Sequence, residues 1–336
     1  MAKNKPTKRR LGGTTRSIEI RDLTKKYGKL SAVDHINLDV YKGEIFGVLG
    51  PNGAGKTTTL LMLATLLKPT SGTAKVNGFN ILEDPTEVRE SISMVFQDPS
   101  SDELLTGYEN LKLHGLLYNL AGEGIERRIE KVLTLVDLTD RKNDLAKKYS
   151  GGMRRRLEIA RGLLHDPQVL FLDEPTLGLD PQTREHIWSY IETLSKEMKI
   201  TILITTHYME EAERLCNRIA IIDHGKVIAL DTPKNLIARL GGDIVKLRAK
   251  KINVSKLKKF KFIKKIEKSN NTVKLTVENT SKNLQKILKE IENVDSVEVR
   301  PLTLNDVFLH YTGREIREEE GTELDQMRAF TRVSSS

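Results

Sequence analysis

The sequence predicts an α/β domain with a parallel-sheet core, followed by a small α+β domain. Short apolar runs at 44–50, 168–174 and 199–207 are typical of strands that are buried on both faces. A glycine pair at 241–242 separates them from a stretch of shorter, alternating segments. With 336 residues, the chain is long enough for two domains that each bury a core.

The first elements are two segments, 17–29 and 32–43, in which apolar and polar residues alternate. This period of two predicts half-buried antiparallel strands. The apolar residues that share the inward face are Ile18, Ile20, Ile36, Leu38 and Val40.

A buried parallel strand is expected next, because the run 44–50 is apolar and ends in glycine. Residues 57–67 continue as a predicted helix. Lys68-Pro69 and a turn at Ser71-Gly72 are expected to end it.

The stretch 103–165 has a helical pattern and forms a helical block inserted in the sequence of the α/β domain. Its apolar positions recur at helical spacing at Ile125, Ile129, Val132 and Val136. Strand patterns resume at 168–174, 199–207 and 218–230. The last of these breaks at His224-Gly225, which predicts a hairpin turn.

The second domain is predicted to contain four strands and one helix. The strands are expected at 243–249, 261–268, 272–279 and 295–300, with the helix at 281–292. The predicted organisation is a basic disordered tail (1–16), an α/β domain (17–240), an α+β accessory domain (243–313) and a charged, disordered tail (314–336).

The net charge of +9 is concentrated in two places. Residues 1–16 carry six basic groups and no acid, and 246–268 carry eleven basic groups and one acid, so the remainder of the chain is acidic. This favours a solvated tail and a solvated domain face over a nucleic-acid surface. A single cysteine excludes an internal disulfide, and the absence of a long apolar run indicates a cytosolic chain.

A phosphate-binding loop is the clearest chemical motif. The sequence GPNGAGKTT, from Gly50 to Thr58, lies between a predicted strand and a predicted helix. Gly53 and Gly55 let backbone N–H groups approach phosphate oxygens, and the helix N-terminus favours the negative charge. Lys56 is expected to reach the β- and γ-phosphates and Thr57 to bind Mg²⁺.

Two carboxylates follow the apolar strand 169–172, at the edge where α/β sheets bind ligands. We expect Asp173 to hold Mg²⁺ and Glu174 to act as general base on the attacking water. Taken alone, the pair could also be a helix cap and a solvated acid. The phosphate loop earlier in the chain favours the catalytic interpretation.

A second anion site is predicted where Ser150, Gly151 and Gly152 lead into a helix. A capped helix would account for this segment by itself. One nucleotide needs one phosphate loop, however, so a second site suggests that ATP is sandwiched between two copies of the chain.

In these motifs and in their order, residues 17 to about 238 resemble the nucleotide-binding subunits of ABC transporters. The resemblance implies that Tyr27 stacks on adenine, that Gln97 contacts Mg²⁺ or water and that His207 contacts the γ-phosphate. It implies that Asp180 communicates across a dimer. It also assigns the whole phosphate loop to ATP: Gly50, Pro51, Asn52, Gly53, Ala54, Gly55, Lys56, Thr57 and Thr58.

The signature segment departs from the family's commonest form, because it begins with Tyr149 and ends with Met153 instead of Leu and Gln. Together with the segments 102–111 and 301–315, it resembles the daunorubicin-resistance branch of drug exporters. That resemblance implies a homodimer of ATPase subunits that uses ATP and Mg²⁺. It also implies separate ABC-2 type permeases, to which the subunit is bound at the inner face of the membrane.

Two other functions are compatible with parts of the sequence. A soluble ABC ATPase acting on ribosomes or nucleic acid would use the basic segments, but such proteins usually carry two cassettes or long coiled-coil insertions. A GTPase or kinase would leave the Ser-Gly-Gly helix unexplained. For the basic segment, a third possibility is contact with anionic lipid headgroups through Lys256, Lys258, Lys259, Lys261, Lys264 and Lys265. The transported substrate is not encoded in any of these motifs.

Overall fold

The computed structural model describes residues 15–120, 122–250, 252–291 and 293–313. The chain divides into two compact units, one of 1–207 with 214–227 and one of 208–213 with 228–336. The tails predicted at 1–16 and 314–336 lie outside the described residues, except for the last two residues of the first tail. Arg16, assigned to that tail, is in fact the first residue of a strand.

An antiparallel sheet in the first unit has the strand order β2-β1-β4-β5. Its strands are β1 (Arg16–Tyr27), β2 (Leu30–Tyr41), β4 (Ser71–Val76) and β5 (Phe79–Asn80). The predicted inward residues Ile18, Ile20, Ile36, Leu38 and Val40 are all buried, which confirms the alternating pattern.

A six-stranded sheet forms the centre of the first unit, in the order β10-β9-β3-β8-β7-β6. Its strands are β3 (Ile45–Leu49), β6 (Ile92–Val95), β7 (Val169–Asp173), β8 (Thr201–Thr206), β9 (Arg218–Asp223) and β10 (Lys226–Asp231). β3 pairs in parallel with β8 and β9, and β7 with β6 and β8. Every residue of β3, β7 and β8 is buried, as the apolar runs predict. The three predicted strands of this sheet therefore bring their carboxyl ends to one edge.

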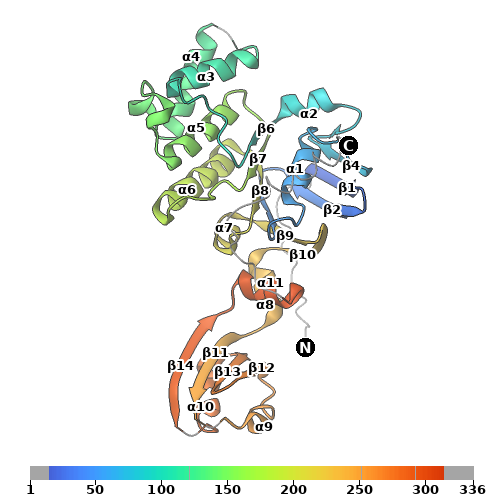
Figure 1. Cartoon of the computed structure of the whole chain (residues 1–336), viewed down its shortest axis with the longest axis vertical. Helices are drawn as coiled ribbons and strands as arrows, with labels where there is room; N and C mark the ends of the chain where they lie inside the picture. Colours follow the sequence, from blue (N-terminus) through green and yellow to red (C-terminus); the bar gives the residue numbers. More distant parts are fainter. Residues whose placement is uncertain (1–14, 121, 251, 292, 314–336) are drawn as a thin grey trace, which may run out of the picture. The chain divides into compact units, whose positions relative to one another are not determined.

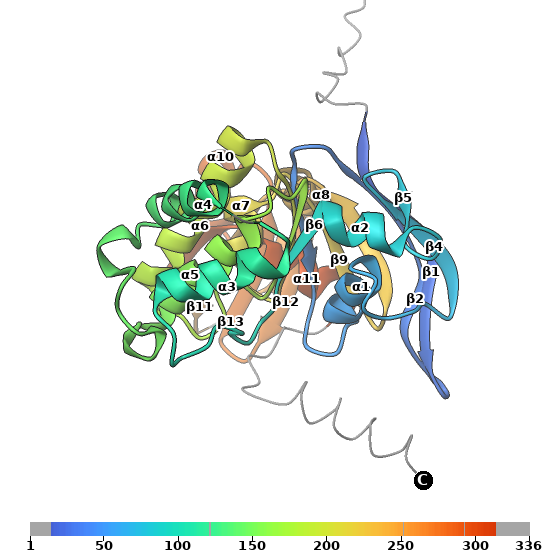
Figure 2. The same cartoon turned by 90° about the horizontal axis from the view of Figure 1, so that it is seen from above.

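Helix α1 (Lys56–Leu63) contacts both sheets of this unit: β7 and β8 of the central sheet, and β2 and β4 of the antiparallel sheet. In both views it lies between the antiparallel sheet and the helical block (Figures 1 and 2). The helix ends four residues before the predicted position 67, because Thr65 adopts a left-handed backbone (φ 62°). The turn predicted at Ser71-Gly72 is wrong, since both residues belong to β4, where the glycine passes close to the backbone of Asp22.

The predicted helical block is confirmed as three α-helices, with two 3₁₀ turns between the second and the third. The α-helices are α3 (Gly107–Leu117), α4 (Glu123–Leu135) and α5 (Gly151–Leu163), and the turns are at Thr139–Arg141 and Ala146–Lys148. The three α-helices pack on one another, and α5 also contacts β6. Three α-helices that the sequence patterns did not predict lie outside the block. They are α2 (Pro85–Ser91), α6 (Pro181–Met198) and α7 (Met209–Leu215).

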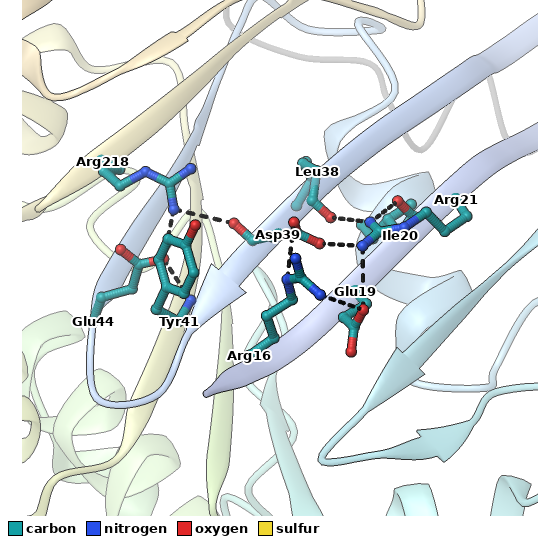
Figure 3. A network of polar contacts seen from close by, with 9 residues as sticks. All are labelled: Arg16, Glu19, Ile20, Arg21, Leu38, Asp39, Tyr41, Glu44 and Arg218. Carbon is teal, nitrogen blue, oxygen red and sulfur yellow. Dashed lines mark hydrogen bonds and ion pairs between the residues drawn. The ribbon is translucent and has the colours of Figure 1, made fainter. Parts of the chain in front are cut away.

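A polar network connects the antiparallel sheet to the central sheet (Figure 3). Arg16 and Arg21 form ion pairs with Asp39 at 3.1 and 2.7 Å. On β9, the guanidinium of Arg218 donates to the carbonyl of Asp39 and pairs with Glu44, both at 3.1 Å. Glu44 directly precedes β3, the strand that leads into the phosphate loop, so these contacts hold the start of β3 close to the antiparallel sheet.

The second unit is an antiparallel sheet in the order β12-β13-β11-β14 with helices. The strands are β11 (Asp243–Ala249), β12 (Ile263–Ser269), β13 (Thr272–Val277) and β14 (Val294–Pro301); the helices are α8 (Pro233–Leu240), α9 (Val254–Leu257), α10 (Thr280–Leu288) and α11 (Leu304–Thr312). The core joins Val245 and Leu275 of the sheet to Leu257 of α9 and Ile287 of α10. Helix α8 packs on α11 and belongs to this unit, whose longer segment starts at Ile228, before the boundary predicted at Gly241-Gly242.

Candidate functional site

The phosphate loop has the compact backbone that its glycines predict. At Gly55, φ is +99°, and an added Cβ would lie 2.3 Å from the carbonyl oxygen of Ala32. At Gly50, a Cβ would lie 2.3 Å from the carbonyl oxygen of Ile222. Neither position can hold a larger residue without moving backbone atoms. The loop turns directly into α1, whose N-terminal N–H groups are the donors that a phosphate needs.

Lys56 is buried, with 3% of its surface exposed. Its ammonium group donates to the carbonyls of Gly50 (2.9 Å) and Pro51 (3.1 Å) and forms an ion pair with Glu174 Oε1 at 3.1 Å. The predicted phosphate-binding lysine and the predicted general base are therefore in direct contact.

Glu174 is held in a sparsely populated backbone conformation, with φ +45°. Its N–H donates to the carbonyl and to the hydroxyl of Thr205, and His207 Nδ1 donates to its Oε2 at 2.9 Å. Burial works to raise the pKa of Glu174, but the hydrogen bond from His207 and the charge of Lys56 outweigh it. The pKa of Glu174 is therefore lowered, and the carboxylate is ionised at neutral pH.

Asp173 ends β7 beside the phosphate loop. Its Oδ1 accepts hydrogen bonds from Thr57 Oγ1 at 3.1 Å and from Thr205 Oγ1 at 2.5 Å. A carboxylate and a hydroxyl are the hard oxygen donors that Mg²⁺ prefers, and they lie next to the lysine that would meet the phosphates. The residues present therefore fit a magnesium ion.

The other predicted site residues occupy separate positions around this cluster. Tyr27, the last residue of β1, is half-buried, and burial raises the pKa of its hydroxyl. Gln97 is exposed and follows β6. Asp180 caps α6 by accepting from the N–H of Thr183 (3.0 Å) and from its hydroxyl (2.6 Å), and these bonds lower its pKa. For Tyr27, Gln97 and Asp180, the roles implied by family resemblance stay predictions.

Ser150 and the two glycines that follow it form the N-terminus of α5. The serine hydroxyl accepts from the N–H of Met153 at 3.3 Å, which makes it the N-cap. Ser150 and Gly151 are exposed, while Gly152 packs closely on Thr183. The helix N-terminus is thus open to a ligand or to another molecule.

The sequence motifs did not identify two residues of the site, Thr205 and Arg155. Thr205 bridges Asp173 and Glu174, as described above, from a neighbouring strand. Its signal is a pair of threonines that interrupts an apolar strand just before His207. Arg155 donates to the carbonyls of Asp173 and Pro175, and its signal is an arginine on the buried side of a helix.

The family model described as "ABC transporter" matches residues 33–177, and the model described as "ATP-binding protein DrrA1-3-like, C-terminal domain" matches residues 232–312. Both units of the chain are thus matched. None of the helices in the described ranges is long and apolar enough to cross a bilayer.

Curated relatives cover most of the chain. The daunorubicin/doxorubicin resistance ATP-binding protein DrrA of Streptomyces peucetius is 46% identical over 70% of this chain and 71% of its own length. The Nod factor export ATP-binding protein I of Cupriavidus pinatubonensis is 39% identical over 90% of this chain and 93% of its own. The linearmycin resistance ATP-binding protein LnrL of Bacillus subtilis is 36% identical over 90% of this chain and its full length.

Solved structures resemble the first unit. One is cbiO1 from Clostridium perfringens, part of the ABC transporter complex cbiONQ, with 30% identity and a TM-score of 0.63 over 67% of this chain and 91% of that one. Another is the dimeric post-hydrolysis cassette MJ0796 bound to ADP and Pi, with 29% identity and a TM-score of 0.58 over 64% of this chain and 98% of that one. The ATP site, both matched models and these relatives agree: the chain belongs to the ATP-hydrolysing, ATP-binding proteins of ABC transporters, in the exporter branch with a DrrA-like C-terminal domain.

Proposed function

We propose that two copies of this chain close on two molecules of ATP and thereby drive separate ABC-2 type permease subunits that export a small molecule or a lipid-like compound. The permease would hold the chain at the inner face of the cell membrane. The observation that carries the proposal is the contact network of Lys56, Asp173, Glu174 and His207.

The dimer is supported by the exposed N-terminus of α5. One ATP would lie against the phosphate loop of one copy and meet Ser150, Gly151 and Gly152 of the other. MJ0796, which resembles the first unit, forms a dimer. Exposed Asp180 lies at the start of the helix that packs on Gly152, so it could respond to the second copy.

The chemistry follows from what ATP would displace. The phosphates would take over the ammonium of Lys56 and release Glu174 Oε1, which would then accept a proton from the attacking water. His207 would stay on Oε2 and keep the carboxylate in place, and its imidazole would also contact the γ-phosphate, as the family resemblance implies. Thr57 and Asp173 would hold Mg²⁺, which neutralises charge on the phosphate oxygens, with Gln97 as a further ligand. Tyr27 would stack on the adenine.

The test is Glu174→Gln, which keeps the size of the side chain and removes the proton acceptor. We expect ATP turnover to fall by about a hundredfold or more. ATP binding should persist, and an ATP-bound dimer should accumulate in size-exclusion chromatography with light scattering. The matched control is Glu197→Gln on the exposed face of α6, which should behave as wild type. Unchanged turnover in Glu174→Gln, or only monomers at saturating ATP, would overturn the proposal.

An apolar surface on α3 supports the membrane partner. Leu113, Leu116 and Leu117 lie on one face of the helix and are 49%, 53% and 74% exposed. Leu104, just before the helix, is 74% exposed. An exposed cluster of this kind marks a protein contact. The names of the relatives, which refer to daunorubicin resistance, linearmycin resistance and Nod factor export, support export of a small molecule or a lipid-like compound.

A further inference from the structure

Three consecutive arginines on α5 contact three different parts of the first unit. Arg154 pairs with Glu103 at 2.6 Å. Arg156 donates to the carbonyls of Val136 (3.0 Å) and Asp137 (2.9 Å) at the end of α4. Between them, Arg155 points to the ATP site. In the sequence the run looks like one basic patch, but the helical rotation of about 100° per residue directs the three side chains differently.

Arg155 is buried, with 5% of its surface exposed, and its guanidinium binds three backbone carbonyls. Its Nε donates to Pro175 at 2.7 Å, and its two terminal nitrogens donate to Asp173 at 2.9 Å and to Phe96 at 2.5 Å. Asp173 and Pro175 are the residues on either side of Glu174. The guanidinium therefore fixes the carbonyls of both residues that flank the predicted general base.

That backbone needs an external restraint. Glu174 has φ +45°, a conformation that a residue with a side chain adopts only when its surroundings impose it. Thr205 restrains the N–H of Glu174 from one side. Arg155 restrains the neighbouring carbonyls from the other side, with donors whose geometry is fixed by the planar guanidinium.

The carbonyl of Phe96, which Arg155 also binds, connects it to residues 96–101, here called the Gln97 segment. One turn further along α5, buried Glu158 accepts from the N–H and hydroxyl of Ser100 at 3.2 and 2.9 Å and from the N–H of Ser101 at 2.8 Å. Helix α5, which is capped by Ser150, thus holds the Gln97 segment through both Arg155 and Glu158.

We propose that Arg155 is a positioning residue for ATP hydrolysis: it fixes the backbone that aims Glu174 at the attacking water and ties it to Gln97 and to α5. It touches neither ATP nor water and acts only through the carbonyls that it holds. The proposal rests on the proposed function, because it needs Glu174 as the general base. Any movement of α5 caused by a partner's ATP at Ser150 would reach Glu174 through this guanidinium.

The first experiment compares Arg155→Gln, Arg155→Lys, Arg154→Gln and Arg156→Gln in the full chain. We expect Arg155→Gln to lower kcat by about thirtyfold and to change the ATP KM less than about threefold. Arg155→Lys can satisfy only part of the carbonyl set and should lie between Arg155→Gln and wild type. Arg154→Gln and Arg156→Gln also lose backbone or ionic partners, yet should keep kcat within about threefold. Equal losses in all three glutamine variants would overturn the proposal, because they would show a general loss of helix packing.

The second experiment combines Arg155→Gln with Glu174→Gln and measures single-turnover hydrolysis. If Arg155 acts through Glu174, its loss adds less than about twofold to the effect of Glu174→Gln alone. A further loss of about thirtyfold would overturn the proposal. If Arg155→Gln unfolds the chain, Arg155→Lys takes its place in the cycle. Failure of the proposed function gives a different result, namely normal turnover in Glu174→Gln itself.

Discussion

Thr205 shows how a neutral side chain can organise a charged site. Its hydroxyl donates to Asp173 Oδ1 and accepts from the N–H of Glu174, so a single oxygen positions both predicted catalytic carboxylates. It can do this because β8 pairs with β7 in a register that sets Thr205 opposite Asp173. His207 directly follows the end of the same strand and reaches Glu174.

Replacing Thr205 with valine keeps the β-branched shape and removes the hydroxyl. We expect Thr205→Val to lower kcat for ATP hydrolysis by about tenfold or more, since Asp173 loses its short hydrogen bond. The matched control is Thr201→Val at the other end of the same strand, where the hydroxyl accepts from the N–H of Gly43. The control should lower thermal stability and leave kcat within about twofold, as measured by ATPase assay and melting. A normal kcat in Thr205→Val would contradict this role.

The sequence predicted the residues that belong to local motifs and missed those that depend on tertiary register. Lys56, Asp173 and Glu174 follow from a strand–loop–helix pattern and from a strand end, and the structure brings them together. Thr205 could not be predicted, because strand order decides which strand lies beside β7. Arg155 could not be predicted, because three adjacent arginines look alike until the helix is placed against β6 and β7.

Among the elements, α11 is fixed by one carboxylate. Asp306 forms a capping box with Thr303 and a bidentate pair with Arg300, at 2.7 and 2.8 Å. Burial works to raise the pKa of Asp306, but the hydrogen bonds from Arg300 and Thr303 outweigh it, so the pKa is lowered. Because the folded pKa lies below the unfolded value, the ionised carboxylate stabilises the second unit at neutral pH.

Asp306→Asn should therefore destabilise the chain by about 1–3 kcal/mol at pH 7. The stabilising effect of Asp306 is complete above its unfolded pKa of about 4 and disappears as the pH falls through the lowered folded pKa. Wild type and Asp306→Asn should thus converge in acid, as followed by urea unfolding at several pH values. The control is Lys246→Gln, whose exposed pair with Glu298 at 3.7 Å should contribute less than about 1 kcal/mol. A gap that persists in acid would contradict the assignment.

The elements also differ in how well a sequence pattern predicts them. Alternation predicted the strand at 243–249 to the residue, because one face of that strand is the core of the second unit. Helices α8 and α11 could not be predicted in the same way. Both helices start with a Thr N-cap, but each has only two turns, so their packing on one another could not be deduced from the helical period.

At the scale of the whole molecule, the surface that meets a permease is predicted to be the exposed apolar face of α3. Leu116→Asp with Leu117→Asp should abolish co-purification with the permease and leave the ATPase activity of the isolated chain within about twofold, since neither side chain is in the core. The matched control places the same two charges on the exposed face of α6, as His186→Asp with Ser189→Asp. Retained co-purification of the α3 variant would direct the search to another face.

Part of the positive charge of the chain is already paired with carboxylates and is less available to bind an anionic partner. Of the six lysines considered for lipid contact, three form ion pairs: Lys256 with Glu290 at 3.5 Å, Lys264 with Glu278 at 3.1 Å and Lys265 with Glu267 at 2.7 Å. Exposed pairs of this kind are weak, but they reduce the local field. The structure thus supports the interpretation of this segment as a solvated domain face.

The contact between Lys56 and Glu174 links the binding of phosphate to the general base. The carboxylate that is predicted to activate water pairs with the ammonium that is predicted to bind phosphate, so phosphate and Glu174 would compete for one cation. The binding of phosphate to Lys56 would then release Glu174 in the same step. We therefore predict that ATP is hydrolysed only after its phosphates have displaced Glu174 from Lys56.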